Sequence, residues 1–188
     1  MATINAGASF LDKNRKLALA VLFLMAIGLI FNRINTFKPE KKIESQSQGA
    51  KIYFEPSLKS YKKGEEFEVK IILDTGNFET DAADVRFGFN PQVLAVQKII
   101  PGTIYDDYPA KRTDLEKEII IINGITSLSK TFKGKGVFAT VVFKGLKPGK
   151  ANLIFEFTPD STTDSNVVAT KIAKDVLEEV EGASIEIN

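Results

Sequence analysis

The chain has 188 residues, of which 44% are apolar, and its 25 basic side chains nearly balance 24 acidic ones, for a net charge of +1. This length and composition suffice for one domain with a packed core. Cys and His are both absent, which excludes disulfides, thiolate metal sites, thiol catalysis and imidazole acid–base chemistry.

The near-zero net charge conceals a division near residue 50. Residues 1–49 hold seven basic and three acidic side chains, whereas residues 50–188 hold eighteen and twenty-one, so the second part is mildly acidic. Its lysines are interspersed with acids along every segment instead of forming a basic block. Nucleic-acid binding needs a clustered basic surface, and we therefore expect no nucleic-acid partner.

Residues 17–31 form an uninterrupted apolar run with one glycine, preceded by a dense basic cluster. A membrane-spanning helix needs roughly 20 residues and a cleavable signal core about 7 to 15, so length alone does not decide between them. No small-x-small cleavage pair follows the run, and Arg33 and Phe37 suit a membrane interface that lengthens the span. We predict a cytoplasmic tail over residues 1–16 and an uncleaved transmembrane signal anchor over residues 17–37. A cleaved signal peptide and a buried soluble helix are the alternatives.

Residues 38–50 are rich in Lys, Glu, Ser and Gln and poor in apolar side chains, which is typical of a flexible tether. Basic residues lie on both sides of the apolar run, so their distribution does not fix the orientation of the anchor. The folded domain is predicted to cover residues 51–188.

Short apolar segments separated by turn residues fill this domain, and they predict an all-β, two-layer sandwich. The nine predicted strands cover residues 52–55, 66–73, 83–89, 94–100, 118–123, 136–144, 152–157, 166–169 and 183–187. Residues 171–180 fit either one short helix or a loop whose Val176 and Leu177 plug the end of the sandwich. We favour the loop.

The strand over residues 83–89 has two contrasting faces. Side chains alternate along an extended chain, so Val85 and Phe87 point to the core while Asp84, Arg86 and Gly88 point away from it. The next two residues, Asn-Pro, close the strand because proline lacks the N–H that a sheet needs. The polar face of this strand is therefore available to a partner or to solvent.

Two oxygen-rich segments could hold a cation, and we favour neither as a site. Residues 105–109, Tyr-Asp-Asp-Tyr-Pro, could offer carboxylates to calcium or rings to a sugar, but adjacent acids in an extended loop point apart. We predict a polar surface loop there, and turn-capping side chains over residues 160–166. No pair of acids is placed for glycoside hydrolysis. We predict no catalytic residue, no metal site and no cofactor.

Four segments in order along the chain resemble a cohesin domain. They are residues 61–71 (YKKGEEFEVKI), 83–94 (ADVRFGFNPQVL), 101–104 (PGTI) and 136–144 (GVFATVVFK). The resemblance extends from about residue 50 to 187. It implies a nine-stranded jelly-roll β-sandwich without catalytic activity, which is exported and binds a dockerin, a small calcium-loaded helical module, through one flat sheet face. It also implies that the domain lies outside the cell.

Cohesins commonly place a polar pair on the strand that ends in the Asn-Pro turn. Asp84 matches one member of the pair, and Ala82 stands where the other would be expected. The strand over residues 118–123 carries four isoleucines, two on each face, so its outer face is unusually apolar, which indicates either an interface or a neighbouring loop that lies over it. The predicted partner-binding residues are Asp84, Arg86, Gly88, Asn123 and Thr126.

The sequence thus predicts a single-pass membrane protein with a cohesin-like module at the cell surface, which binds a dockerin-like partner, in a setting of polysaccharide binding or breakdown. The first alternative is a carbohydrate-binding module, against which the absence of Trp argues. The second is a structural, pilin-like subunit. Against it, the apolar run ends at Phe31 and a polar tether follows, whereas a pilin helix would continue into the domain.

Overall fold

The structure is a computed structural model, and it describes residues 49–188. The predicted tail, the membrane anchor and nearly all of the predicted tether lie outside these residues. Among residues 49–188, no helix has the length and apolar character needed to span a membrane.

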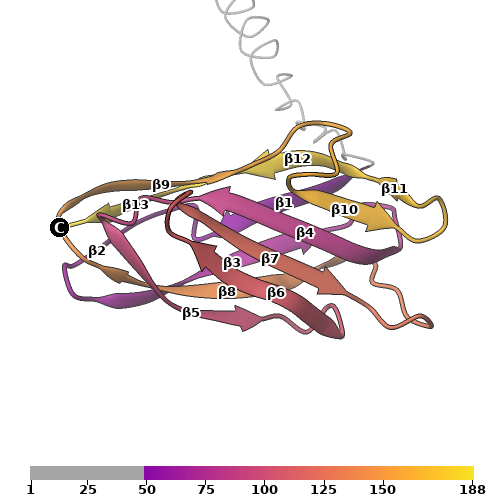
Figure 1. The fold of residues 1–188 in the computed structure, drawn as a ribbon, viewed down its shortest axis with the longest axis horizontal. Helices are drawn as coiled ribbons and strands as arrows, with labels where there is room; N and C mark the ends of the chain where they lie inside the picture. The colour runs from indigo at the N-terminus through magenta and orange to yellow at the C-terminus, as the bar shows by residue number, and fades with distance from the viewer. Residues whose placement is uncertain (1–48) are drawn as a thin grey trace, which may run out of the picture. The chain divides into compact units, whose positions relative to one another are not determined.

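The described part of the chain consists of β-strands joined by turns and loops (Figure 1). In chain order the strands are β1 (Ala50–Glu55), β2 (Leu58–Tyr61), β3 (Glu66–Asp74), β4 (Thr80–Gly88), β5 (Leu94–Pro101), β6 (Asp107–Asp114), β7 (Ile119–Ile125), β8 (Lys135–Gly145), β9 (Gly149–Phe155), β10 (Asn166–Ala169), β11 (Lys174–Asp175), β12 (Leu177–Glu181) and β13 (Ala183–Ile187).

The strands form two sheets that pack face to face as a sandwich (Figure 1). The first sheet has the order β12-β1-β3-β8-β5, and the second has the order β11-β10-β4-β9-β13-β2, with β7 on β4 and β6 on β7. Strand β4 pairs with β7 along one edge, and on its other edge it pairs first with β10 and then with β9. The predicted all-β sandwich is confirmed.

Three phenylalanines join the two sheets at the centre of the core. Phe54 of β1 stacks on Phe155 of β9 with ring centroids 4.2 Å apart, and its edge meets the ring of Phe87 of β4 at 5.0 Å. All three rings are at most 6% exposed. Because β1 belongs to the first sheet and the other two strands to the second, this cluster is an inter-sheet contact.

All nine predicted strands are present, but the predicted total of nine is wrong, because residues 49–188 contain thirteen strands. Strands β2, β6, β11 and β12 were not predicted. Strand β6 has the sequence DYPAKRTD, and it is a sheet edge that pairs only with β7. Such polar, proline-containing edge strands lack the apolar alternation from which strands are predicted.

The loop predicted over residues 171–180 is wrong for its second half. A turn ends at Ala173, after which β11 pairs with β10, and β12 runs parallel to β1. Val176 and Leu177 are 8% and 5% exposed, so they do enter the core as expected of a plug. The carboxylate Oδ1 of Asp175 organises this segment, because it accepts hydrogen bonds from the backbone N–H groups of Val167 at 2.9 Å and Leu177 at 3.0 Å.

The polar surface loop predicted over residues 105–109 is also wrong. Tyr105 and Tyr108 are each only 4% exposed, and their rings pack against Phe138. The Tyr105 hydroxyl lies 2.9 Å from Oγ1 of Thr80, and burial raises the pKa of Tyr108 to about 12. Of this segment, the two acids between these rings and Pro109 face solvent. Within residues 49–188, no group of three acidic side chains is placed to hold a metal ion.

Truncation of the inter-sheet cluster should be the most damaging single change in the core. We expect Phe87→Ala to lower the free energy of unfolding by about 3 to 5 kcal/mol, because it removes a fully buried ring that packs between the two sheets. Ile154→Ala is the matched control, since Ile154 lies on a neighbouring strand and is 62% exposed, and a change of about 0.5 kcal/mol or less is expected. Urea denaturation measures both, and equal losses would contradict the assignment of the core.

Gly124 on β7 is required by side-chain packing. A Cβ atom at this position would lie 2.7 Å from the ring of Tyr105, 2.8 Å from that of Phe138 and 3.1 Å from that of Tyr108. We expect Gly124→Ala to cost about 1 to 3 kcal/mol of folding free energy. In the control Gly88→Ala the new Cβ meets nothing closer than 3.9 Å, so its unfolding midpoint should stay near that of the wild type.

Candidate functional site

The outer face of the second sheet carries most of the candidate residues. Ala83, Val85 and Phe87 are at most 1% exposed, so alternation along β4 directs Asp84 and Arg86 away from the core, as the sequence predicts. This side of β4 continues across β7 and β6 in one direction and across β10 and β9 in the other.

The register of the strands arranges this outer face into four cross-strand rows. We name them by the residue that β4 contributes: the alanine row (Asp107, Ile125, Ala82, Val168, Asp175), the aspartate row (Ala110, Asn123, Asp84, Asn166), the arginine row (Arg112, Ile121, Arg86) and the glycine row (Asp114, Ile119, Gly88, Ile154). Successive rows are two residues apart along each strand, or about 7 Å. The two end rows are therefore apolar on β4 and the strands beside it and carry aspartates at their margins, and charged and amide groups lie in the two rows between them.

The aspartate row is a hydrogen-bonded unit. The side-chain amide of Asn123 donates to Oδ1 of Asp84, and the amide of Asn166 donates to Oδ2 of the same carboxylate at 3.5 Å. The structure thus brings together two residues that the sequence singled out, Asp84 and Asn123. Asn166 was missed as a site residue, because it lies in the polar stretch that the sequence assigned to turn capping.

The arginine row is attached to the connection between β9 and β10. Nη1 of Arg86 donates to the carbonyl of Thr163 at 2.5 Å. Oγ of Ser165 accepts from the backbone N–H of Arg86 and donates to its carbonyl, both at 3.0 Å. We call residues 156–165 the flap. Its two ends are joined by the hydrogen bond from Ser165 N–H to the Glu156 carbonyl at 2.9 Å.

A pocket of about 280 Å³ lies between the flap and the sheet. The two arginines of the arginine row line it together with Ile121, the Asp84–Asn123 pair and residues 162–164 of the flap. Ile121 is only 5% exposed, and Ile119 in the next row is 7% exposed. The apolar outer face of β7 is therefore covered by neighbouring groups, as expected if a neighbouring loop lies over it.

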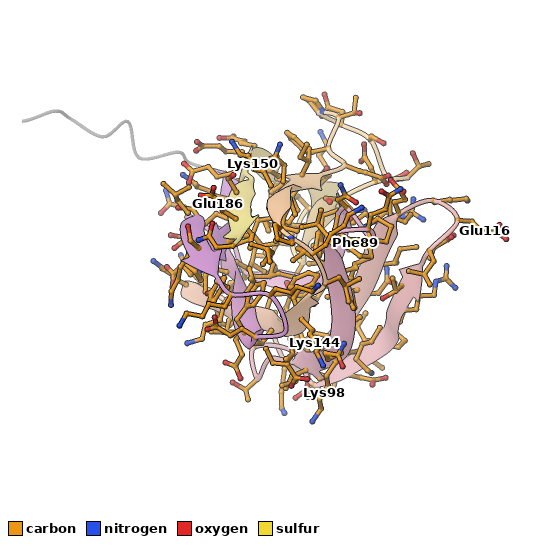
Figure 2. The ribbon with its side chains drawn as sticks, turned by 90° about the vertical axis from the view of Figure 1, so that its left-hand side faces the viewer. Phe89, Lys98, Glu116, Lys144, Lys150 and Glu186 are labelled. Carbon is orange, nitrogen blue, oxygen red and sulfur yellow. The ribbon has the colours of Figure 1, made fainter. Side chains whose placement is uncertain are left out.

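The glycine row forms the floor of a wider groove of about 700 Å³. Because Gly88 has no side chain, the groove runs between its register neighbours Ile119 and Ile154. The side chain of Ile154 is 62% exposed. Lys117 and Lys150 line its rim together with two glutamates. Figure 2 looks along the sandwich from this end, with Lys150 at the top of the view and Glu116 at the far tip of the β6–β7 turn.

Several solved structures similar to this one are cohesins. One is CaCohA2 of Clostridium acetobutylicum in complex with a variant of the dockerin CaDoc0917, with a TM-score of 0.61, 13% identity, and coverage of 74% of this chain and 99% of that one. Another is the third ScaC cohesin of Acetivibrio cellulolyticus with the ScaB dockerin, with a TM-score of 0.60, 17% identity and coverage of 73% and 98%. A third is the non-cellulosomal cohesin of the archaeon Archaeoglobus fulgidus, with a TM-score of 0.55, 13% identity and coverage of 74% and 91%.

The chain has the cohesin fold. The predicted resemblance to cohesins is confirmed by the structure. Because the sequence identities are only 13–17%, this confirmation concerns the fold. No protein-family model matches the sequence, and no curated protein matches it either. The partner and the contact residues of this cohesin fold are therefore matters for proposal.

Thr126 directly follows β7 and belongs to a loop that hydrogen bonds hold in place. Its hydroxyl lies 2.9 Å from the carbonyl of Lys130 and 3.3 Å from that of Asp81. The carboxylate of Asp106 holds the same loop, because it accepts from the backbone N–H of Ser127 at 2.9 Å and from Nζ of Lys130 at 2.7 Å. Leu128, at the tip, is fully exposed, so the loop presents an apolar side chain beside the alanine row.

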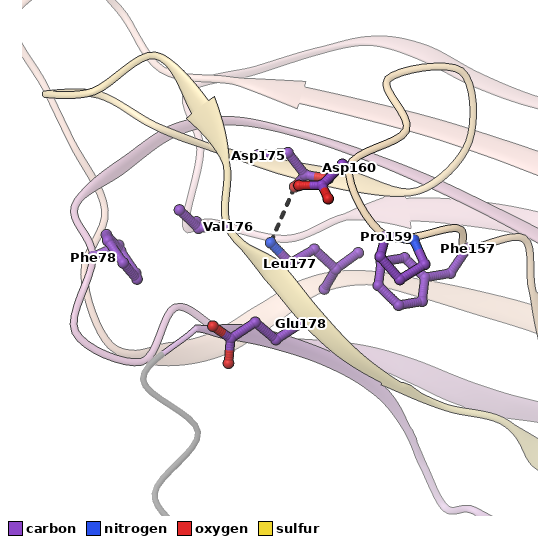
Figure 3. A pocket seen from close by; sticks show the side chains of 8 residues that line it. All are labelled: Phe78, Phe157, Pro159, Asp160, Asp175, Val176, Leu177 and Glu178. Carbon is purple, nitrogen blue, oxygen red and sulfur yellow. Dashed lines mark hydrogen bonds between the residues drawn. The ribbon is translucent and has the colours of Figure 1, made fainter.

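A second pocket, of about 290 Å³, lies at the end of the sandwich where β11 and β12 meet (Figure 3). Apolar side chains such as Phe78 and Phe157 line it together with Asp160 and Asp175, all of which Figure 3 labels. Asp175 makes the backbone contacts that organise the segment, and Asp160 takes a left-handed backbone conformation with φ of 64°. This pocket is thus a structural element of the β10–β12 connection.

The Asp106–Lys130 pair should make the Thr126 loop sensitive to acid. The hydrogen bond from Lys130, supported by the N–H of Ser127, lowers the pKa of Asp106 from 3.8 to about 2. A carboxylate with a lowered folded-state pKa adds stability above its ordinary pKa, and that stability is lost as the pH falls toward the folded value. We expect the melting temperatures of wild type and Asp106→Asn to differ at pH 6 and to converge near pH 2. A difference that persisted unchanged at pH 2 would contradict this.

Proposed function

We propose that the chain is a membrane-anchored, extracytoplasmic cohesin-like module that binds a dockerin-type protein through the outer face of its second sheet. The observation that carries the proposal is the four-row face, which displays fixed polar groups between two end rows that are apolar around β4. Two of the similar structures are cohesins in complex with dockerins, which supports this class of partner.

The four rows suit a protein partner because their side chains are held in place before binding. Asp84 is fixed by two amides and Arg86 by the flap, so little side-chain entropy remains to be lost when a partner arrives. Both residues project from the middle of a sheet that is anchored by buried rings. Rigid elements with locked side chains support precise recognition.

The alanine row gives a structural context for Ala82. Its register neighbours are Ile125, 41% exposed, and Val168, and the exposed Leu128 lies on the loop that follows β7. A partner that docks here meets an apolar row at the position where the cohesin resemblance leads one to expect a polar side chain. We therefore propose that the partner of this module presents apolar side chains to the alanine row.

The anchor, the cell-surface location and the setting of polysaccharide binding or breakdown are part of this proposal. They rest on the apolar run over residues 17–31 and on the cohesin resemblance. A non-enzymatic role is proposed on the same resemblance, and the sequence offers no His, no Cys and no acid pair in the spacing that glycosidases use.

Carbohydrate binding by the module itself is disfavoured by the exposed side chains. Within residues 49–188, every large apolar side chain that is exposed is Leu or Ile. Tyr61, Tyr105 and Tyr108 are buried, and Tyr53 lies between two lysines, with Nζ of Lys135 5.1 Å from its ring centroid. Sugar-binding faces usually offer flat, exposed aromatic rings, which these residues do not provide.

Binding to purified dockerins tests the proposal directly. The full chain is titrated calorimetrically with the dockerins CaDoc0917 and ScaB, once with calcium and once with EDTA. We expect calcium-dependent binding that Asp84→Ala and Arg86→Ala each weaken by about 2 kcal/mol or more, or roughly thirtyfold, since each removes a fixed polar contact.

Lys98→Gln serves as the control, because Lys98 is exposed on β5 of the first sheet and should not affect binding. Binding that survives both substitutions in the second sheet would place the interface elsewhere. Absence of dockerin binding, together with retention on insoluble polysaccharide, would favour the carbohydrate alternative.

A further inference from the structure

The arginine row contains two guanidinium groups that no acid of the described residues neutralises. Arg86 and Arg112 are the register partners of Ile121 on its two sides, so they stand two strands apart over one isoleucine. Within residues 49–188, neither guanidinium lies within ion-pair distance of a carboxylate, although other lysine–acid pairs of this domain do. Two like charges held side by side destabilise a face unless an anion comes between them.

The two acids that line the same pocket make no ion pair with either arginine. The carboxylate of Asp84 accepts from two side-chain amides, whereas Oδ1 of Asp164 is buried in the flap without a hydrogen-bond partner among the described residues. Arg86 uses its Nη1 for the Thr163 carbonyl, whereas Arg112 makes no hydrogen bond with the described residues and is exposed. The guanidinium of Arg112 is therefore free to bind a group from outside.

The flap limits how such a group can approach. It closes one side of the 280 Å³ pocket, and the covered side chain of Ile121 forms part of the lining between the two arginines. An arginine side chain offers its donors in a planar fork that matches a carboxylate. This small, half-open site holds a small planar anion at the end of a side chain better than it holds an extended segment.

We propose that this pocket receives the carboxylate of an Asp or Glu side chain of the partner, with Arg112 as its main contact and Arg86 beside it. The inference rests on the proposed function, because it names the chemistry of the partner at the same face. The next row contains Asp84, about 7 Å away, which is close to the rise of one helical turn. A partner helix that lies along β4 would thus present a hydrogen-bond donor to Asp84 about four residues from its acid.

The carboxylate pocket can be tested without the natural partner. The ¹⁵N-labelled full chain is titrated with N-acetylglutamate amide and, as the neutral isostere, N-acetylglutamine amide, while the Nε–H signals of both arginines and the backbone amide of Ile121 are followed by NMR. We expect saturable shifts with the glutamate probe and an apparent Kd at least threefold higher with the glutamine probe. Arg112→Gln should abolish the difference, and Lys98→Gln should preserve it.

Equal responses to the two probes, absence of any saturable shift, or an unchanged response in Arg112→Gln would overturn the inference. Arg112→Lys separates charge from geometry, because it keeps the positive charge and loses the fork. We expect it to retain part of the preference for glutamate.

The same variants in the dockerin titration separate the two proposals. If neither dockerin binds and the glutamate probe still occupies the pocket, the dockerin proposal fails and the carboxylate pocket stands. If a dockerin binds Arg112→Gln as tightly as wild type while Asp84→Ala loses binding, the dockerin proposal stands and the acidic contact is overturned. A loss of about tenfold or more in Arg112→Gln supports both.

Discussion

The contact of Phe54 with Phe87 and Phe155 is the interaction on which the other features of this domain depend. It joins β1 of one sheet to β4 and β9 of the other through rings with centroids 4.2 and 5.0 Å apart. Because side chains alternate along a strand, a ring fixed in the core determines which face every neighbour on its strand occupies. A slip of β4 by one residue would bury Arg86 and expose Phe87, so the core excludes that register.

The candidate binding face is the outer counterpart of this core. The pairing that places Val85 and Phe87 against the first sheet also places Asp84 opposite Asn123, and Arg86 in line with Ile121 and Arg112. Polar recognition groups are thus positioned by the hydrophobic contacts behind them. Within the described residues neither guanidinium has an ion-pair partner, and such charges are tolerated at a surface because the long apolar stem of an arginine lets its charged end remain in water.

The sequence was most informative where burial and alternation agree, as in β4, whose inward and outward residues were both predicted correctly. It failed at β6, because the pairing of this polar edge strand depends on β7. Tyr105 and Tyr108 are both buried, three residues apart, and the ladder register shifts between Asp107 and Ala110, which breaks the simple alternation. Arg112 and Asn166 escaped notice for a related reason: their positions beside Ile121 and Asp84 follow from strand order, which no local pattern reveals.

The closure of the flap has a consequence for how such a module can diversify. A single backbone hydrogen bond joins Glu156 and Ser165, and the Ser165 hydroxyl occupies the place that a neighbouring strand would take beside Arg86. Apart from Phe157, which packs against the core, and Thr163, whose carbonyl holds Arg86, the residues between these two ends can therefore change in composition without altering the register of β9 or β10. The flap is a natural grafting point, where partner selectivity could be rebuilt on an unchanged scaffold.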